Sequence, residues 1–172
     1  MEVNAVIYCR TSTEAQASEH RGSIPEQLEA CEALCQEKEY QIVERYIDAE
    51  NYRDAKGKLR PPSGQRKDRP TYQRLVRDAL AKEFEVIVTW KEDRLYRGIF
   101  AVVPFGEMLE AVEKQGPKMI VDFVEGTFDE QMLYIEAAMA KIEIENMQAR
   151  MMMGKRGKAK RSQFPACAIP YS

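Results

Sequence analysis

Residues 86–90 read Val-Ile-Val-Thr-Trp, and this short stretch decides the fold class. A continuous run of apolar and β-branched residues is typical of a strand whose sheet is covered on both faces. Comparable strand signals occur at Val3–Cys9, Gln41–Ile47 and Met119–Val124. Helical patterns separate these runs, so the sequence predicts an α/β domain with a mostly parallel sheet of about four strands.

The helical patterns have apolar residues three or four positions apart. One runs from Pro25 to Glu39, the next begins at Pro70, and a third runs from about Val103 to Lys114 with Pro104 in its first turn. Proline is tolerated there because the first turn of a helix has no partner for its N–H groups.

The longest helical pattern covers residues 129–161. A helix of about 30 residues is ~45 Å long, so it should extend beyond a small domain. Its apolar stripe predicts a dimer interface, although a helix lying across the domain would show the same pattern. The stripe consists of Met132, Ile135, Met139, Ile142, Asn146, Ala149 and Met153.

The composition is that of a soluble globular protein: of 172 residues, 44% are hydrophobic and 31% are charged. A largely disordered chain is excluded, and no apolar run approaches the ~20 residues of a membrane span. The four cysteines and the lack of a secretory signal indicate cytoplasmic thiols. A zinc site at Cys31 and Cys35 would need Cys9 or Cys167 as well, so we expect small buried side chains and no metal.

Charge is concentrated at the carboxyl end of the chain. Six bases follow Glu145 without any acid: Arg150, Lys155, Arg156, Lys158, Lys160 and Arg161. The whole chain has a formal charge of −2, so the rest of it carries −8. A basic arm on an acidic body favours contact with a polyanion, although cations also stabilise a helix carboxyl terminus. A second basic stretch, residues 53–69, has no hydrophobic periodicity and is predicted to be a long loop.

Two polar clusters follow predicted strands. Tyr8, Arg10 and Ser12 share one face if the first strand remains extended to its end. Asp93, Arg94 and Arg97 follow the strand at 86–90. Capped helix ends with surface ion pairs would explain the second cluster alone, but both clusters should meet above the same sheet edge. Arginines around a serine, with no acidic cage and no metal-ligand set, suit a phosphate.

These residues resemble the motifs of the serine site-specific recombinases, the resolvase and invertase family. The similarity covers about residues 3–153, and the ending Phe164–Ser172 resembles the start of a further domain in the large members. The matching motifs, in chain order, are Tyr8-x-Arg10-x-Ser12-Thr13, Ser23-Ile24-Pro25-Glu26-Gln27-Leu28, Arg69-Pro70-x-Tyr72-x-x-Leu75 and Trp90-Lys91-x-Asp93-Arg94-Leu95-x-Arg97.

The resemblance implies a three-layer resolvase-like fold, divided into a catalytic domain at 1–128, a dimerisation and DNA-contacting helix at 129–161, and a linker at 162–172 leading to a recognition domain. It implies that Ser12 attacks DNA to form a 5′-phosphoserine, while Arg10, Arg94, Arg97 and Arg69 hold the scissile phosphate. Tyr8, Gln16 and Gln27 would support the site by hydrogen bonds, and Asp93 would handle protons or position an arginine. A homodimer would assemble into a tetramer on double-stranded DNA without ATP or metal, in a bacterial, phage or mobile-element setting.

The chain departs from the family at several points. Asn51-Tyr52 replaces a small Ser-Gly pair, the segment up to Arg69 is longer and more basic, and Ile144 replaces an arginine after Glu143. A catalytically impaired DNA-binding or assembly protein is therefore an alternative, and an ordinary phosphoesterase is a third. A Ser-His-Asp arrangement is disfavoured because the single histidine, His20, lies in a polar segment.

Overall fold

Four parallel strands form the central sheet in the order β2-β1-β5-β6, with β1 and β5 in the middle. They span Val3–Arg10 (β1), Tyr40–Asp48 (β2), Val86–Thr89 (β5) and Ile120–Phe123 (β6). The computed structural model describes residues 2–11, 23–63 and 66–160. Every residue of β5 is buried, which confirms the prediction of a sheet covered on both faces.

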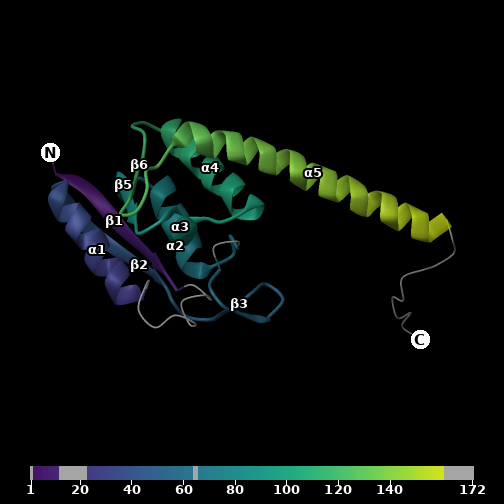
Figure 1. Cartoon of the computed structure of the whole chain (residues 1–172), viewed down its shortest axis with the longest axis horizontal. Helices are drawn as coiled ribbons and strands as arrows, with labels where there is room; N and C mark the ends of the chain where they lie inside the picture. The colour runs from purple at the N-terminus through teal and green to yellow at the C-terminus, as the bar shows by residue number, and fades with distance from the viewer. Residues whose placement is uncertain (1, 12–22, 64–65, 161–172) are drawn as a thin grey trace.

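Helices cover the two faces of the sheet and complete a three-layer α/β fold (Figure 1). On one face α1 (Ile24–Glu37) packs Cys31 and Cys35 against Ala5, Ile7 and Cys9 of β1. On the other face lie α2 (Pro70–Leu80), α4 (Ile99–Glu113) and the first part of α5 (Glu130–Lys160). The predicted α/β class and parallel four-stranded sheet are confirmed.

Local sequence signals explain where α1 begins. Ser23 caps the helix by accepting a hydrogen bond from the Glu26 N–H, and the Glu26 carboxylate accepts one from the Ser23 N–H. This reciprocal capping box satisfies two N–H groups that a helix start would otherwise leave unpaired.

Burial raises the pKa of the Cys35 thiol to about 11, so this core cysteine stays protonated.

The prediction for α4 is wrong at its start. The helix begins at Ile99, not near Val103, so Pro104 lies inside it instead of in the first turn. Gly98 precedes the helix with φ +73°, a conformation that favours glycine. Apolar residues continue on both sides of Pro104, and the helix is held by burial of Ala101, Val102 and Phe105 despite the lost N–H.

The predicted long loop at residues 53–69 contains a short hairpin that the sequence analysis did not predict. Two short strands, β3 (Tyr52–Arg53) and β4 (Leu59–Arg60), pair antiparallel to form a hairpin. Pairs of two residues are too short to show the alternation that marks a strand. The hairpin, residues 52–60, depends instead on turn chemistry around Asp54 and on Gly57, whose φ is +74°.

The long helix α5 confirms the prediction of a projecting element (Figure 1). Leu133, Ala137 and Ala140 are buried against the domain, while Met139 and Ile142 are 66% and 60% exposed. Over the described residues, no helix is long and apolar enough to cross a membrane, and no group of three His, Cys, Asp or Glu side chains could hold a metal ion.

Candidate active site

The carboxyl ends of the strands bring together polar residues that are far apart in the sequence. Arg10 is the last residue of β1, and it lies opposite Asp48, the last residue of β2, in the register of the two strands. The short helix α3 (Glu92–Leu95) follows β5 and contributes Asp93 and Arg94. Ligands of open α/β sheets bind outside this edge, so the cluster is the candidate active site.

Arg10 lies at the centre of this cluster and is only 3% exposed. Its Nε donates to the Arg94 carbonyl (3.1 Å), and its Nη2 donates to the Asp93 carbonyl (2.6 Å). Its Nη1 donates to the carbonyls of Thr11 (2.9 Å) and Pro62 (3.5 Å). The guanidinium thus ties the end of β1, just before Ser12 in the sequence, to α3.

The charge of Arg10 is only partly compensated. Burial lowers its pKa from the ordinary arginine value, and the neighbouring cations Arg69 and Arg94 lower it further. Carbonyl oxygens accept hydrogen bonds without cancelling a full positive charge. An anion at this position would therefore relieve repulsion among the guanidiniums.

Gln27 holds the backbone of Arg10 from the neighbouring helix. Its Oε1 accepts a hydrogen bond from the Arg10 N–H (3.1 Å), and its Nε2 donates to the Arg10 carbonyl (3.0 Å). The Gln27 side chain is completely buried, so water does not compete for these bonds. The supporting role that the resemblance implies for Gln27 stays a prediction, and in this structure its side chain holds the backbone of Arg10.

A second buried group joins Tyr8, Asp48 and Arg69. The Tyr8 hydroxyl donates to Asp48 Oδ2 (2.6 Å) and accepts a hydrogen bond from Arg69 Nη1. Arg69 Nη1 also lies 3.0 Å from Asp48 Oδ2, with the two side chains 0% and 3% exposed. Burial raises the pKa of Tyr8 well above its ordinary value, so its hydroxyl remains a donor.

Arg69 is fixed at the amino end of α2 in this structure. Its Nη2 donates to the Leu95 carbonyl (3.0 Å), its Nε donates to the Arg66 carbonyl (2.7 Å), and its guanidinium lies 4.4 Å from the centre of the Tyr72 ring. The direct phosphate contact implied for Arg69 remains a prediction. In the present arrangement its guanidinium instead links α2 to Tyr8 and α3.

Arg94 is buried too, in contrast to a surface ion-pair residue. It is 8% exposed, and its Nη1 donates to Asp93 Oδ2 (3.0 Å). Two atoms of this pair, Arg94 Nε and Asp93 Oδ1, are buried without a hydrogen-bond partner among the described residues. Arg97 lies just beyond α3 and is exposed.

One carboxylate also lies in this cluster, because Asp48 pairs with Arg69. This carboxylate was not a candidate, yet it is buried among the candidate residues. Its place at the carboxyl end of β2 was the available signal, since neighbouring parallel strands end at the same edge. Ser12 and Gln16 lie outside the described residues.

The basic arm is helical as far as it is described. Arg150 donates to Glu143 Oε1 (2.8 Å), and both Lys155 and Arg156 are exposed near the end of α5. Lys158 and Lys160 belong to α5, but their side chains lie outside the description, as does Arg161 altogether.

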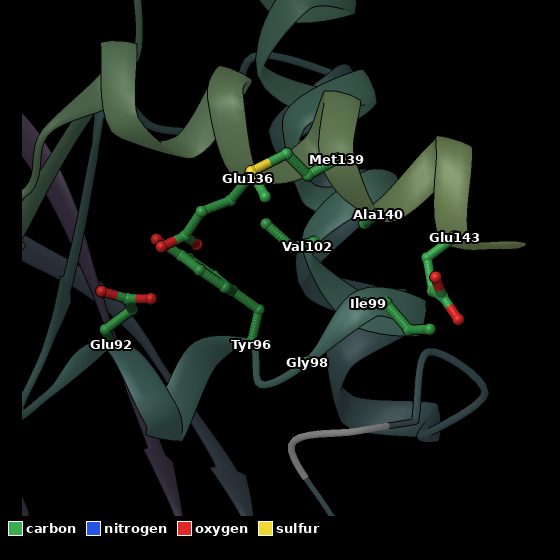
Figure 2. A pocket seen from close by; sticks show the side chains of 9 residues that line it. All are labelled: Glu92, Tyr96, Gly98, Ile99, Val102, Glu136, Met139, Ala140 and Glu143. Carbon is green, nitrogen blue, oxygen red and sulfur yellow. The ribbon is translucent and has the colours of Figure 1, made fainter.

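A hollow of about 400 Å³ lies between α5 and the segment joining α3 to α4. Figure 2 shows the carboxylates of Glu92 and Glu136 on the same side of this hollow, next to the Tyr96 ring. Burial raises the pKa of Glu92, and the negative charge of Glu136 raises it further. A hollow with this charge repels phosphate, in contrast to the arginine cluster at the carboxyl ends of the strands.

Comparisons with known proteins identify the family of the domain. The family described as "Resolvase, N terminal domain" matches residues 5–163. The N-terminal catalytic domain of TP901-1 integrase is 27% identical, with a TM-score of 0.61, and the match covers 84% of this chain and 98% of that one. A resolvase family site-specific recombinase from Streptococcus pneumoniae has a TM-score of 0.63 at 23% identity, covering 92% and 99% of the two chains. A comparison with curated protein sequences gave no significant match.

The fold and the matched residues define a catalytic domain of the serine recombinase class. The chain belongs to the resolvase N-terminal domain family, whose general activity is site-specific DNA recombination. The resemblance found in the sequence motifs is thereby confirmed.

Proposed function

We propose that this domain cuts and rejoins DNA through a covalent phosphoserine intermediate on Ser12. The observation that carries the proposal is the position of Arg10. Its guanidinium bonds both Thr11, the residue before Ser12, and the two α3 residues Asp93 and Arg94. The chain therefore reaches Ser12 directly from a cluster of cations suited to a scissile phosphate.

The proposed step is a direct transfer of the phosphoryl group. The Ser12 oxygen forms a bond to phosphorus as the bond from phosphorus to the 3′ oxygen breaks. The serine proton is lost and the departing 3′ oxygen gains one, so the cut leaves a 5′-phosphoserine and a 3′ hydroxyl. One phosphoester replaces another, and the reverse reaction rejoins DNA without ATP or metal.

Arginine charge takes the place of a histidine base in this proposal. Negative charge grows on the phosphoryl oxygens in the transition state, and Arg10, Arg94 and Arg97 stabilise it. Asp93 holds Arg94 through its Oδ2, whereas Gln27 and Tyr8 act by positioning. Arg69 joins the phosphate ligands only if its contacts with Tyr8 and Asp48 rearrange.

The helix α5 supports assembly of two or more copies. Met132, Ile135, Met139 and Ile142 are each more than half exposed on it. Such a continuous apolar surface is typical of a protein interface. We infer a homodimer formed through α5, assembling into a tetramer on double-stranded DNA, with Arg150, Lys155 and Arg156 contacting phosphates together with Lys158, Lys160 and Arg161.

Trapping the covalent intermediate tests the proposal. The chain is incubated with duplexes from the flanks of its reading frame, nicked so that rejoining is blocked, and protein–DNA adducts are separated on a denaturing gel. We expect an adduct with the wild-type chain and none with Ser12→Ala, while Ser18→Ala serves as the matched control and keeps the adduct.

Each outcome discriminates between the functions considered. An adduct that survives in Ser12→Ala would reject the nucleophile assignment. Binding to duplexes without any adduct in the wild-type chain would favour the impaired DNA-binding protein. Repeated turnover with water as the acceptor would identify a phosphoesterase.

A further inference from the structure

The hairpin of residues 52–60 is a small, self-contained structure organised by one carboxylate. Asp54 accepts hydrogen bonds from the N–H groups of Lys56 and Lys58 (both 3.0 Å) and from Arg60 Nε (2.9 Å). Its own N–H donates to the Lys58 carbonyl, which closes the turn. The bonds from Arg60 and the backbone lower the pKa of Asp54 to about 2, so it is ionised at neutral pH.

Asp54 pairs with Arg60, and three other cations of the hairpin have no counterion among the described residues. Arg53, Lys56 and Lys58 are all exposed, and none forms an ion pair with a described residue. Arg53 Nη1 donates to the Gly57 carbonyl (2.9 Å), a neutral acceptor that leaves its charge intact. The lysine side chains are not needed for the turn, because only their backbone N–H groups bond Asp54.

The hairpin is anchored to the candidate active site at its base. The Tyr52 hydroxyl donates to Asp68 Oδ1 (2.8 Å), next to Arg69 in the sequence. On the other side, the Pro62 carbonyl, two residues after β4, accepts a hydrogen bond from Arg10 Nη1. These contacts attach the base of the hairpin, and with it the backbone that carries the three cations, to the arginine cluster.

The hairpin and the basic end of α5 lie on the same side of the sheet (Figure 1). A hollow of about 460 Å³ lies between the segment that follows the hairpin and α5. Arg66, Lys67 and Asp68 line it on one side, Ile144 and Gln148 line it on the other, and Glu107 of α4 lies beside them. Arg150 follows Gln148 by two residues, or ~3 Å of helix rise. Two cationic elements therefore border one concave region, with the candidate active site adjoining the hairpin.

We propose that the hairpin is a second DNA-contacting element, in which Arg53, Lys56 and Lys58 bind backbone phosphates of the duplex near the scissile phosphate. This inference rests on the proposed function, because DNA is taken as the occupant. Unpaired flexible cations suit phosphates without reading bases, so the contact adds affinity and holds the duplex against the site without sequence preference.

Salt dependence of binding measures these contacts directly. The affinity of the full 172-residue chain for a short duplex of mixed sequence is titrated at salt concentrations from ~50 to ~200 mM. The variants are Lys56→Gln/Lys58→Gln and the control Lys82→Gln/Lys114→Gln, which removes the same charge at the opposite edge of the sheet. The slope of log affinity against log salt is negative, and we expect it to become less steep by about 1.8 in the hairpin variant, roughly 0.9 per lost contact, and to stay unchanged in the control.

Adduct formation by the same proteins separates the two proposals. If the wild-type chain forms the Ser12 adduct but the hairpin variant keeps the wild-type slope, the hairpin inference is wrong and the proposed function stands. If the wild-type chain binds the duplex and never forms an adduct, the proposed function fails while the slope still reports on the hairpin. Weaker self-association of the hairpin variant, with an unchanged slope, would assign the hairpin to an acidic surface of a second copy and overturn the inference.

Discussion

Removing the negative charge from the buried Asp48–Arg69 pair should destabilise the fold strongly. In Asp48→Asn the shape of the side chain is kept, but Arg69 remains a cation with a completely buried side chain. Breaking a buried pair from one side costs ~3–5 kcal/mol. We expect a loss near 3 kcal/mol, the lower end, because the Tyr8 hydroxyl and the carbonyls of Leu95 and Arg66 still accept from Arg69.

Equilibrium unfolding in urea provides the measurement. With a slope of about 2 kcal/mol per molar urea, a loss of ~3 kcal/mol lowers the midpoint by roughly 1.5 M. The control is Glu32→Gln, which removes the Arg45–Glu32 ion pair. This pair is separated by 2.8 Å, close to the 3.0 Å of the Arg69–Asp48 pair, but its side chains are 46% and 43% exposed. An exposed pair contributes less than ~1 kcal/mol, so this midpoint should fall by at most ~0.5 M.

Equal midpoints for Asp48→Asn and the control would refute the reasoning that burial sets the cost. Should Asp48→Asn fail to fold, Tyr8→Phe gives an independent measure. Tyr8→Phe keeps the ion pair and removes the hydroxyl between the two charges, so we expect the free energy of unfolding to fall by ~1–3 kcal/mol. A Tyr8→Phe variant as stable as wild type would show that this hydroxyl contributes no net stability.

The remaining predictions concern the site, the interface and two helix positions. Arg94→Lys should lower the rate of adduct formation on nicked duplexes by roughly 10²-fold or more, because an ammonium lacks the planar fork of Arg94; an unchanged rate would make Arg94 a purely structural residue. Ile142→Glu should weaken self-association in sedimentation experiments while leaving the melting temperature of the dilute protein unchanged, and unaltered association would remove α5 as the interface. Glu92→Gln should stabilise the chain near neutral pH by no more than ~0.5 kcal/mol. Folding raises the pKa of Glu92, so ionisation of its carboxyl destabilises the folded state as pH rises through the folded-state pKa. The stability gained in Glu92→Gln should therefore vanish below the pH range in which an ordinary glutamate titrates. Thermal melts across pH test this. Pro104→Ala should raise stability by about 2 kcal/mol in urea, since a helix-interior proline costs ~3 kcal/mol and its stiffening of the unfolded chain returns up to ~1.

The sheet and the long helix could be predicted because their signals are local. The buried run at 86–89 reports burial directly, and the three- and four-residue spacing along α5 reports helical periodicity. The hairpin could not be found in this way, because its conformation depends on the Asp54 side chain and on Gly57 rather than on an apolar pattern. Pro104 misled the prediction of α4, since burial on both sides of it outweighs the missing hydrogen bond.

In the candidate site too, the features that could be predicted are those with a local sequence signal. Arg10 could be placed at the sheet edge from the end of its strand, but its partners could not be predicted, because they are the carbonyls of Thr11, Pro62, Asp93 and Arg94. Every residue has a carbonyl, so no residue type signals this arrangement. Arg69 depends on both kinds of acceptor. It donates to the carbonyls of Leu95 and Arg66 and also to the side chains of Tyr8 and Asp48. Substitutions that keep the path of the backbone should therefore leave Arg10 in place, whereas Arg69 also loses bonds when the Tyr8 hydroxyl or the Asp48 carboxylate is removed.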